Sequence, residues 1–129
     1  MSLAPLDLFA PSVLCLAGGG TIRAETPPRM SPGADGWCVA MFRAETGHDV
    51  HADRWEVHPG GEEAVCVLAG AARLILRGED GASEEEPVTL SAGTACIVPR
   101  GRWHRLELDG PADLMSVTMR LGTRTEPRS

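Results

Sequence analysis

Lysine, tyrosine, asparagine and glutamine do not occur in this sequence, and all 12 of its basic residues are arginine. Without lysine, the chain can form neither a Schiff base with a carbonyl substrate nor a phosphate-binding loop of the lysine-containing type. Without asparagine it has no acceptor for N-linked glycosylation, and without tyrosine it has no phenolic general acid. Any chemistry therefore falls to Asp, Glu, His, Ser, Thr, Cys, Arg and a metal ion that they hold.

Basic residues are fewer than acidic ones. The 18 Asp and Glu residues exceed the 12 arginines, which gives a formal net charge of -6 and a pI of about 5.1. Such a chain repels phosphate backbones and anionic membrane surfaces, so we expect no nucleic-acid or membrane partner. Arg100, Arg102 and Arg105 form the one candidate basic cluster, which the rim of a binding cleft explains equally well.

The cysteines form no Cys-x-x-Cys pair, which argues against a zinc knuckle or a thioredoxin-type site. The apolar stretch at the amino terminus is interrupted by Pro5 and Pro11 and has no positive charge before it, so we expect no secretory signal. No apolar run approaches the length of a membrane span. We therefore expect a soluble cytoplasmic protein with buried, reduced thiols at its four cysteines: Cys15, Cys38, Cys66 and Cys96.

Helical periodicity is also lacking, except plausibly in the first dozen residues. The 15 glycines and 10 prolines divide the apolar residues into short packets. The pattern predicts nine strands, over Ser12–Leu16, Trp37–Arg43, Val50–Val57, Ala64–Ala69, Ala71–Arg77, Pro87–Leu90, Thr94–Val98, Arg102–Leu108 and Asp113–Leu121. Gly70, between two apolar strands, predicts a tight bend that uses a positive φ. The sequence thus predicts an all-β sandwich or barrel.

The length of 129 residues predicts a single domain. We expect an N-terminal segment with a short helix or strand arm over residues 1–36 and a β-barrel over residues 37–121. Residues 122–129 contain almost no apolar side chains, so we expect a flexible tail there.

Histidine is scarce and therefore informative. Residues two apart in a strand share a face, so Glu56 and His58 point one way while Trp55 and Val57 point the other. One face of this strand is apolar, and the opposite face offers groups that bind metals.

Further candidates follow in the next turns. After Pro-Gly-Gly the chain returns at Glu62 and Glu63, one of which should lie beside Glu56 and His58. A second hairpin places His104 at the start of a strand. We expect His48 and His51, which precede the strand that carries His58, to lie on the surface, and Glu62 to face solvent.

The sequence around His104 resembles the second motif of the cupin superfamily. That motif reads Gly, five residues, Pro, one residue, Gly, two residues, His, three residues, Asn. Gly93, Pro99, Gly101 and His104 are in register with it, and Leu108 stands in place of the Asn.

The first cupin motif, which reads Gly, five residues, His, one residue, His, three or four residues, Glu, six residues, Gly, is matched in part. His58, Glu63 and Gly70 agree with it, whereas Val50 and Glu56 replace the first Gly and the first His. An alternative alignment takes His58 as the first histidine, but the motif would then end on Ala69, so Gly70 favours Glu63 over Glu62.

The resemblance implies a jelly-roll barrel, the cupin double-stranded β-helix, with a divalent metal ion inside it. Carried over residue by residue, the metal ligands are Glu56, His58, Glu63 and His104. This donor set suits iron, manganese, zinc, nickel or copper, and the carboxylate of Glu56 in place of a histidine favours harder cations. In the alternative, Glu56 marks a site without metal and hydrogen-bonds to a histidine, although burying two carboxylates without a cation is costly.

The stretches Trp-Glu-x-His-Pro and Arg-Gly-x-Trp-His-Arg look like those of small single-domain bacterial cupins, a resemblance that implies a fold and a site but no reaction. One hypothesis is a mononuclear metal enzyme, such as an oxygenase, isomerase or hydrolase, acting on a small molecule. The other is a ligand-binding or sensing module without turnover. Because cupins commonly pair through their outer sheets, we also expect a homodimer, with an apolar outer face formed by Trp55, Val57, Leu68 and Trp103.

Overall fold

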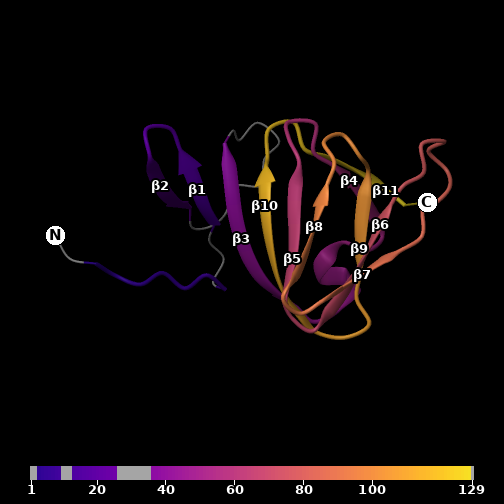
Figure 1. The fold of residues 1–129 in the computed structure, drawn as a ribbon, viewed down its shortest axis with the longest axis horizontal. Helices are drawn as coiled ribbons and strands as arrows, with labels where there is room; N and C mark the ends of the chain where they lie inside the picture. The colour runs from indigo at the N-terminus through magenta and orange to yellow at the C-terminus, as the bar shows by residue number, and fades with distance from the viewer. Residues whose placement is uncertain (1–2, 10–12, 26–35, 129) are drawn as a thin grey trace.

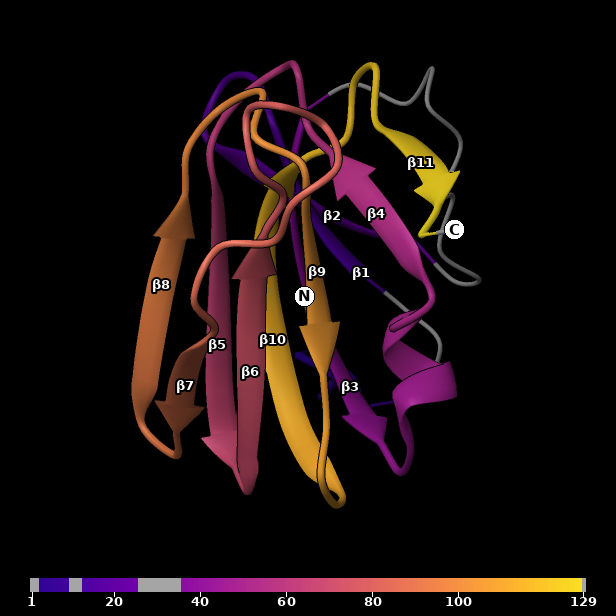
Figure 2. The same ribbon diagram turned by 90° about the vertical axis from the view of Figure 1, so that its right-hand side faces the viewer.

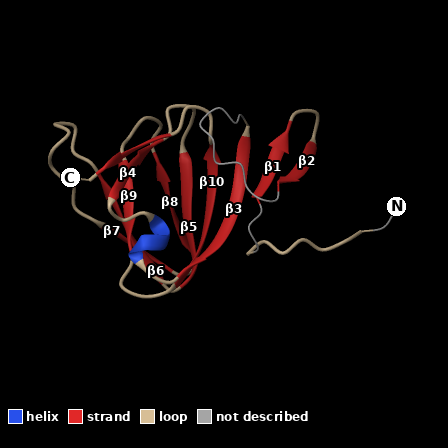
Figure 3. Cartoon of the chain, turned by 180° about the vertical axis from the view of Figure 1, so that it is seen from behind, coloured by secondary structure: helices blue, strands red, loops and turns tan. Residues whose placement is uncertain are grey.

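The computed structural model describes residues 3–9, 13–25 and 36–128 of the chain. Within these residues it forms eleven strands in two antiparallel sheets, with one short 3-10 helix (Figures 1 and 3). This arrangement confirms the all-β prediction and a single small domain. No helix in the described ranges is long and apolar enough to cross a membrane.

The larger sheet has six strands in the order β2-β1-β3-β10-β5-β8, which run across Figure 1. Their bounds are Thr21–Glu25 for β2, Val13–Ala17 for β1, Trp37–Ala44 for β3, Ala112–Met119 for β10, Glu63–Ala69 for β5 and Thr94–Val98 for β8.

The smaller sheet has five strands in the order β11-β4-β9-β6-β7, and Figure 2 shows it from its side of the molecule. Their bounds are Arg124–Pro127 for β11, Arg54–Val57 for β4, His104–Glu107 for β9, Ala71–Leu76 for β6 and Val88–Ser91 for β7.

Eight of the nine predicted strands are present, with ends that differ by no more than two residues. The prediction of a strand over Val50–Val57 is wrong in its first half, because Gly47–Val50 forms the 3-10 helix η1 and β4 begins only at Arg54. A capping box between Thr46 and Asp49 starts η1, and His51 ends it in the left-handed region, with φ of 51°. The helical turn and the left-handed conformation of His51 exclude a continuous strand from Val50.

The ends of the chain also differ from expectation. Residues 3–9 contain no helix and extend away from the sheets (Figure 1), whereas residues 10–12 lie outside the described part. Within the expected flexible tail, β11 pairs with β4 in antiparallel register, and the Arg128 backbone nitrogen donates to the Asp53 carbonyl at 2.8 Å. Backbone pairing with β4 holds this polar strand, which has no buried face of its own. The division into 1–36, 37–121 and 122–129 stays a prediction.

The hydrophobic core lies between the two sheets. It is built from Ala44, Val65, Val67, Ala72, Leu74, Leu90, Val98, Ala112 and Leu114. Gly70, at the bend between β5 and β6, has φ of +79°, as predicted, and a Cβ atom there would lie 2.5 Å from the Pro111 carbonyl oxygen. The bend can therefore pack against the start of β10 only if residue 70 is glycine.

Along three neighbouring strands the interior changes from a packed core to a cavity. On β10, Leu114 belongs to the core and Thr118 lines the cavity. On β5 the same change runs from Val67 to Glu63, and on β3 it runs from Ala44 to Cys38. One end of the sandwich is thus closed by apolar packing, and the other remains open to a ligand.

Candidate metal centre

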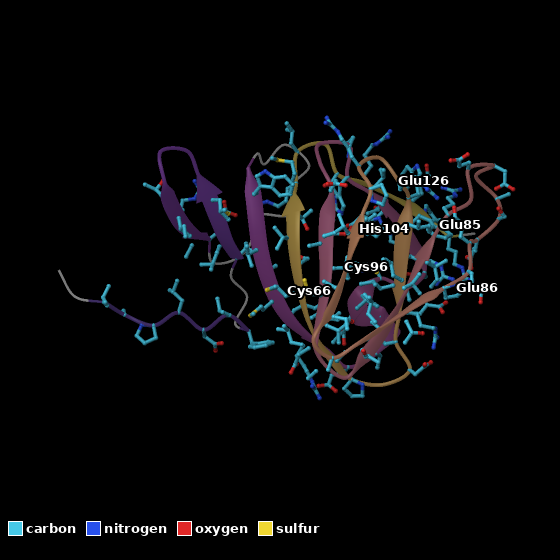
Figure 4. The ribbon with its side chains drawn as sticks, in the orientation of Figure 1. Cys66, Glu85, Glu86, Cys96, His104 and Glu126 are labelled. Carbon is cyan, nitrogen blue, oxygen red and sulfur yellow. The ribbon has the colours of Figure 1, made fainter. Side chains whose placement is uncertain are left out.

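The structure brings together Glu56, His58, Glu63 and His104, the four residues that the sequence singled out. Each offers one ligand atom, and these atoms all lie within 4.8 Å of one another. Glu56 lies on β4 and is the register partner of His104, the first residue of β9 (Figure 4). His58 follows the end of β4, and Glu63 begins β5 in the opposite sheet. Glu62 is exposed, as expected.

The four side chains surround a common point. Nε2 of His58 lies 3.1 Å from Oε1 of Glu56 and 3.3 Å from Oε1 of Glu63. Nε2 of His104 lies 2.9 Å from the same Glu63 oxygen and 3.8 Å from the Glu56 oxygen. Two ligands bound at right angles to one ion, each at about 2.1 Å, stand about 3.0 Å apart. The separations therefore match those of ligands that share an ion.

Neighbouring groups fix the orientation of the ligands. Nδ1 of His104 lies 3.2 Å from the Arg102 carbonyl oxygen, which only a protonated Nδ1 can approach as a donor. In the neutral ring, the lone pair on Nε2 then points into the site. Nδ1 of His58 is 2.8 Å from Oγ1 of Thr123, and Oγ1 of Thr118 donates to Oε2 of Glu63 at 2.7 Å. These contacts leave Oε1 of Glu63 for the site.

Burial and charge make the cluster electrostatically coupled. His58, Glu63 and His104 are buried, whereas the Glu56 side chain is 41% exposed. Burial disfavours the charged form of His58, but the carboxylates of Glu56 and Glu63 outweigh it and raise the pKa to about 9. Burial likewise opposes ionisation of Glu63, but the two histidines outweigh it and lower that pKa to about 2. The site therefore stabilises a positive charge between its carboxylates.

The donor set fits a divalent metal ion. Two imidazoles and two carboxylates are ordinary ligands of transition metals. Although carboxylate oxygens approach Nε2 of His58, no group in the described residues has the geometry of a hydrogen bond to this buried atom. A buried nitrogen aimed at a cluster of oxygens without a hydrogen bond is suited to a cation at their centre.

The candidate metal centre opens into a cavity of about 330 Å³. Its apolar wall includes Phe42, Val50 and Leu106, and its polar wall includes Arg54 and Arg120. The cavity is large enough for a small organic molecule.

Several polar residues at the site were not found from the sequence. Arg54 shares the alternation of Glu56 and His58 along β4, so the strand pattern could have identified it. Thr123 lies in the expected flexible tail, where no sequence signal pointed to the site. His51 is exposed, as expected, but it also lies at the cavity wall.

The outer face expected for pairing needs correction. Trp55 and Val57 are buried rather than exposed, so they offer no surface to a second chain. The guanidinium groups of Arg77 and Arg105 lie 5.7 and 5.4 Å from the Trp55 ring and cover it. Trp103 is half-buried, and Leu68 alone of the four expected residues is clearly exposed.

Two of the three arginines in the candidate basic cluster form ion pairs. Arg102 pairs with Glu85 at 2.6 Å, and buried Arg105 pairs with Glu84 at 2.9 Å and with Glu107 at 2.6 Å. These carboxylates offset the charges of Arg102 and Arg105, whereas Arg100 is exposed and donates from Nε to the Pro59 carbonyl oxygen at 2.7 Å.

Comparison with protein families decides the relationship of the chain. A family model described as the cupin domain matches residues 40–118. The chain belongs to this cupin family. Comparison with curated proteins finds no match.

Solved structures with the same fold include a cupin-2 domain containing protein from Shewanella frigidimarina. It has 17% identity and a TM-score of 0.50, over 72% of this chain and 76% of that one. A structure from work on the Mn(II) centres of Bacillus subtilis oxalate decarboxylase has 20% identity and a TM-score of 0.52. That match covers 70% of this cupin chain but only 23% of the decarboxylase. At these identities the similarity shows the fold alone.

Proposed function

We propose that this cupin binds a divalent transition metal ion through Glu56, His58, Glu63 and His104 and uses it to bind a small molecule in the adjoining cavity. The observation that carries the proposal is the convergence of four ligand atoms within 4.8 Å at the wall of a cavity of about 330 Å³. If the protein is an enzyme, an oxygenase, isomerase or hydrolase reaction fits, because the ion would polarise a substrate oxygen or activate water or dioxygen.

Manganese and iron are the first metals to test. Carboxylate oxygens suit hard cations and imidazoles suit the later transition metals, so an equal number of each favours an ion between these extremes. The Mn(II) centres of the structurally similar oxalate decarboxylase add support for manganese. Two anionic carboxylates would leave the ion formally neutral and weaken it as a Lewis acid relative to a site with three histidines.

The chain's own residues have distinct roles in this proposal. Arg102 and Thr123 orient the two imidazoles, and Thr118 leaves one oxygen of Glu63 free for the ion. Glu56 is the most exposed of the four ligands, so it can exchange a proton with a molecule in the cavity most readily.

A second candidate function is binding or sensing of a ligand without turnover. It is favoured by the close contacts among the four side chains themselves, since a protonated His58 between Glu56 and Glu63 would also balance the charge without a metal. In this case Glu56 is a hydrogen-bonding residue, and the cavity alone binds the ligand. Location in the cytoplasm and a homodimeric state remain predictions from the sequence.

Metal analysis tests the proposal. The protein is purified after growth with manganese, iron, zinc, nickel and copper, and its bound metal is measured by mass spectrometry. We expect about one ion per chain in the wild type and in His48→Ala, which removes an exposed histidine outside the cavity wall. We expect a loss of metal in His58→Ala and His104→Ala. Equal and negligible metal in all four proteins would overturn the proposal in favour of the metal-free alternative.

A further inference from the structure

Arg54 lies in the cavity wall next to the candidate metal centre. It precedes Glu56 by two residues on β4 and shares its face, and both residues line the cavity. Two residues along a strand correspond to about 6.5 Å. A guanidinium group and a metal ligand are thus presented to the same space by one short strand.

The Arg54 side chain is held by a neutral partner. Its Nε and Nη2 donate to Oγ1 of Thr125 at 3.3 and 3.0 Å. Thr125, on β11, is the register partner of Glu56, and it also lines the cavity. The terminal strand therefore fixes the guanidinium group beside the centre without neutralising its charge.

Arg54 differs in this respect from the other arginines of the cavity wall. Arg105 forms ion pairs with Glu84 and Glu107, and Arg120 pairs with Glu25 at 3.2 Å. No ion pair of Arg54 is found among residues 3–9, 13–25 and 36–128. Asp49, another acid of the wall, accepts hydrogen bonds from the backbone nitrogens of Glu45 and Thr46 instead.

We propose that Arg54 binds the carboxylate of the small molecule that occupies the cavity, which makes the ligand an organic acid with a second oxygen group directed at the metal. The inference rests on the proposed function, because the second oxygen group needs the metal ion. The guanidinium fork matches a carboxylate with two parallel hydrogen bonds, and partial burial strengthens them. The apolar side of the cavity, with Phe42, Val50 and Leu106, is suited to the carbon chain between the two groups.

The charge of the site supports this ligand class. Glu56 and Glu63 alone would repel an anion, and a metal ion would only neutralise them. Arg54 adds the positive charge that makes the cavity attractive to an acid. An uncharged ligand would leave this guanidinium group without an anionic partner.

Titration calorimetry with defined acids tests the proposal. Protein loaded with Mn²⁺ is titrated with malonate, succinate and glutarate, with acetate as a singly charged probe and malonamide as an uncharged one. We expect at least one dicarboxylate to bind more tightly than acetate, and malonamide to give no detectable binding. In Arg54→Gln the affinity for that dicarboxylate should fall about 10- to 100-fold.

Two further variants separate charge from position. Arg124→Gln removes a guanidinium group from the same strand as Thr125 but outside the cavity wall, and it should bind the acid within about twofold of the wild type. Arg54→Lys keeps the charge but loses the fork, so its affinity should lie between those of wild type and Arg54→Gln. Unchanged metal content in both Arg54 variants shows that they are folded.

The outcomes distinguish this inference from the proposed function. Metal-loaded protein that binds no acid of the series, or that binds it equally well in Arg54→Gln, overturns the role of Arg54 and leaves the metal site standing. Protein that takes up no metal but still binds acids through Arg54 overturns the metal site and supports Arg54 as an acid-binding residue.

Discussion

Cys15 and Cys38 are register partners on β1 and β3, and their sulfur atoms lie 3.6 Å apart. Both thiols are free and buried, and Cys38 lines the cavity. The sequence prediction of buried thiols is confirmed for this pair, whereas Cys66 and Cys96 are only partly buried. Directly opposed residues in an antiparallel pair have Cα atoms about 4.5–5.5 Å apart, within the range that disulfides span. A small rotation of the two side chains would therefore bring the sulfur atoms within bonding distance, and oxidation would then link β1 to β3 by a disulfide.

We expect an added peroxide to oxidise this pair to a disulfide, with two thiols and one peroxide giving one disulfide and two waters. Burial raises the pKa of the Cys38 thiol to about 11, and a hydrogen bond with Cys15 contributes to the rise. Because the thiolate is the reactive form, the oxidation should become faster as the pH rises into the alkaline range. Mass spectrometry after thiol labelling measures the product.

Cys38→Ser should abolish the intramolecular disulfide, whereas Cys96→Ser should leave it intact. Cys66 and Cys96 stand in neighbouring strands (Figure 4), but Cys96 packs against the core and its register partner is Val65 rather than Cys66. A Cys66–Cys96 crosslink in place of the Cys15–Cys38 one would contradict the prediction.

A second prediction concerns the bend at Gly70. Gly70→Ala should destabilise the protein by about 3 kcal/mol or more, because a positive φ strains alanine and the new methyl group meets the Pro111 carbonyl oxygen. Gly81→Ala is the matched control, since Gly81 has φ of +76° but nothing within 4 Å of its Cβ position. Urea denaturation measures both. Equal losses in the two variants would show that backbone strain alone sets the cost.

Gly70 also shows what the sequence could specify about the site. The six-residue step from glutamate to glycine in the first cupin motif selected Glu63 over Glu62, and alternation along one strand placed Glu56 beside His58. The first inference rests on the family resemblance, and the second rests on local strand geometry, which a sequence encodes directly. The packing of Trp55 was predicted wrongly because its cover consists of arginine side chains from distant strands.

The contribution of the last strand could not be predicted for a different reason. β11 has no buried residue, so neither hydrophobic pattern nor propensity indicates it. It forms because β4 offers an unpaired edge, and it carries Thr125 to the cavity just after the turn that supplies Thr123. The partners of His58 and Arg54 are therefore set by tertiary pairing alone.

A third prediction concerns stability in acid. Arg105 lowers the pKa of Glu84 through a hydrogen bond at 2.9 Å, and Arg128 adds a further hydrogen bond. Since the folded-state pKa lies below the ordinary value of 4.5, ionised Glu84 stabilises the fold above that pH, and the stabilisation is lost as the pH falls through the folded pKa.

Glu84→Gln should therefore lower the Tm by about 2–5 °C at neutral pH, and its difference from the wild type should shrink below pH 4.5. Glu86→Gln is the control, because Glu86 is exposed two residues further along the same loop (Figure 4). Thermal melts followed by circular dichroism measure the change. A constant difference between Glu84→Gln and wild type across this pH range would refute the electrostatic explanation.

The last prediction concerns the outer face of the six-stranded sheet. Ile97, Ala64, Val117 and Val39 are successive register partners across β8, β5, β10 and β3. They face away from the core, because their neighbours along each strand line the core or the cavity. Ile97 is 59% exposed, and Leu68 lies on the same face of β5. We therefore predict that this row, in place of Trp55 and Val57, is the surface through which two chains pair.

We expect the wild type to elute as a dimer in size exclusion with light scattering, and Ile97→Glu to elute as a monomer. A glutamate buried in the dimer interface would lose its hydration without gaining a partner, at a cost of several kcal/mol. Val88→Glu, on the smaller sheet and 49% exposed, should leave the dimer intact, since it adds the same charge at an apolar site away from this row. A monomeric wild type would refute the dimer, and a dimer that survives Ile97→Glu would place the interface elsewhere on the molecule.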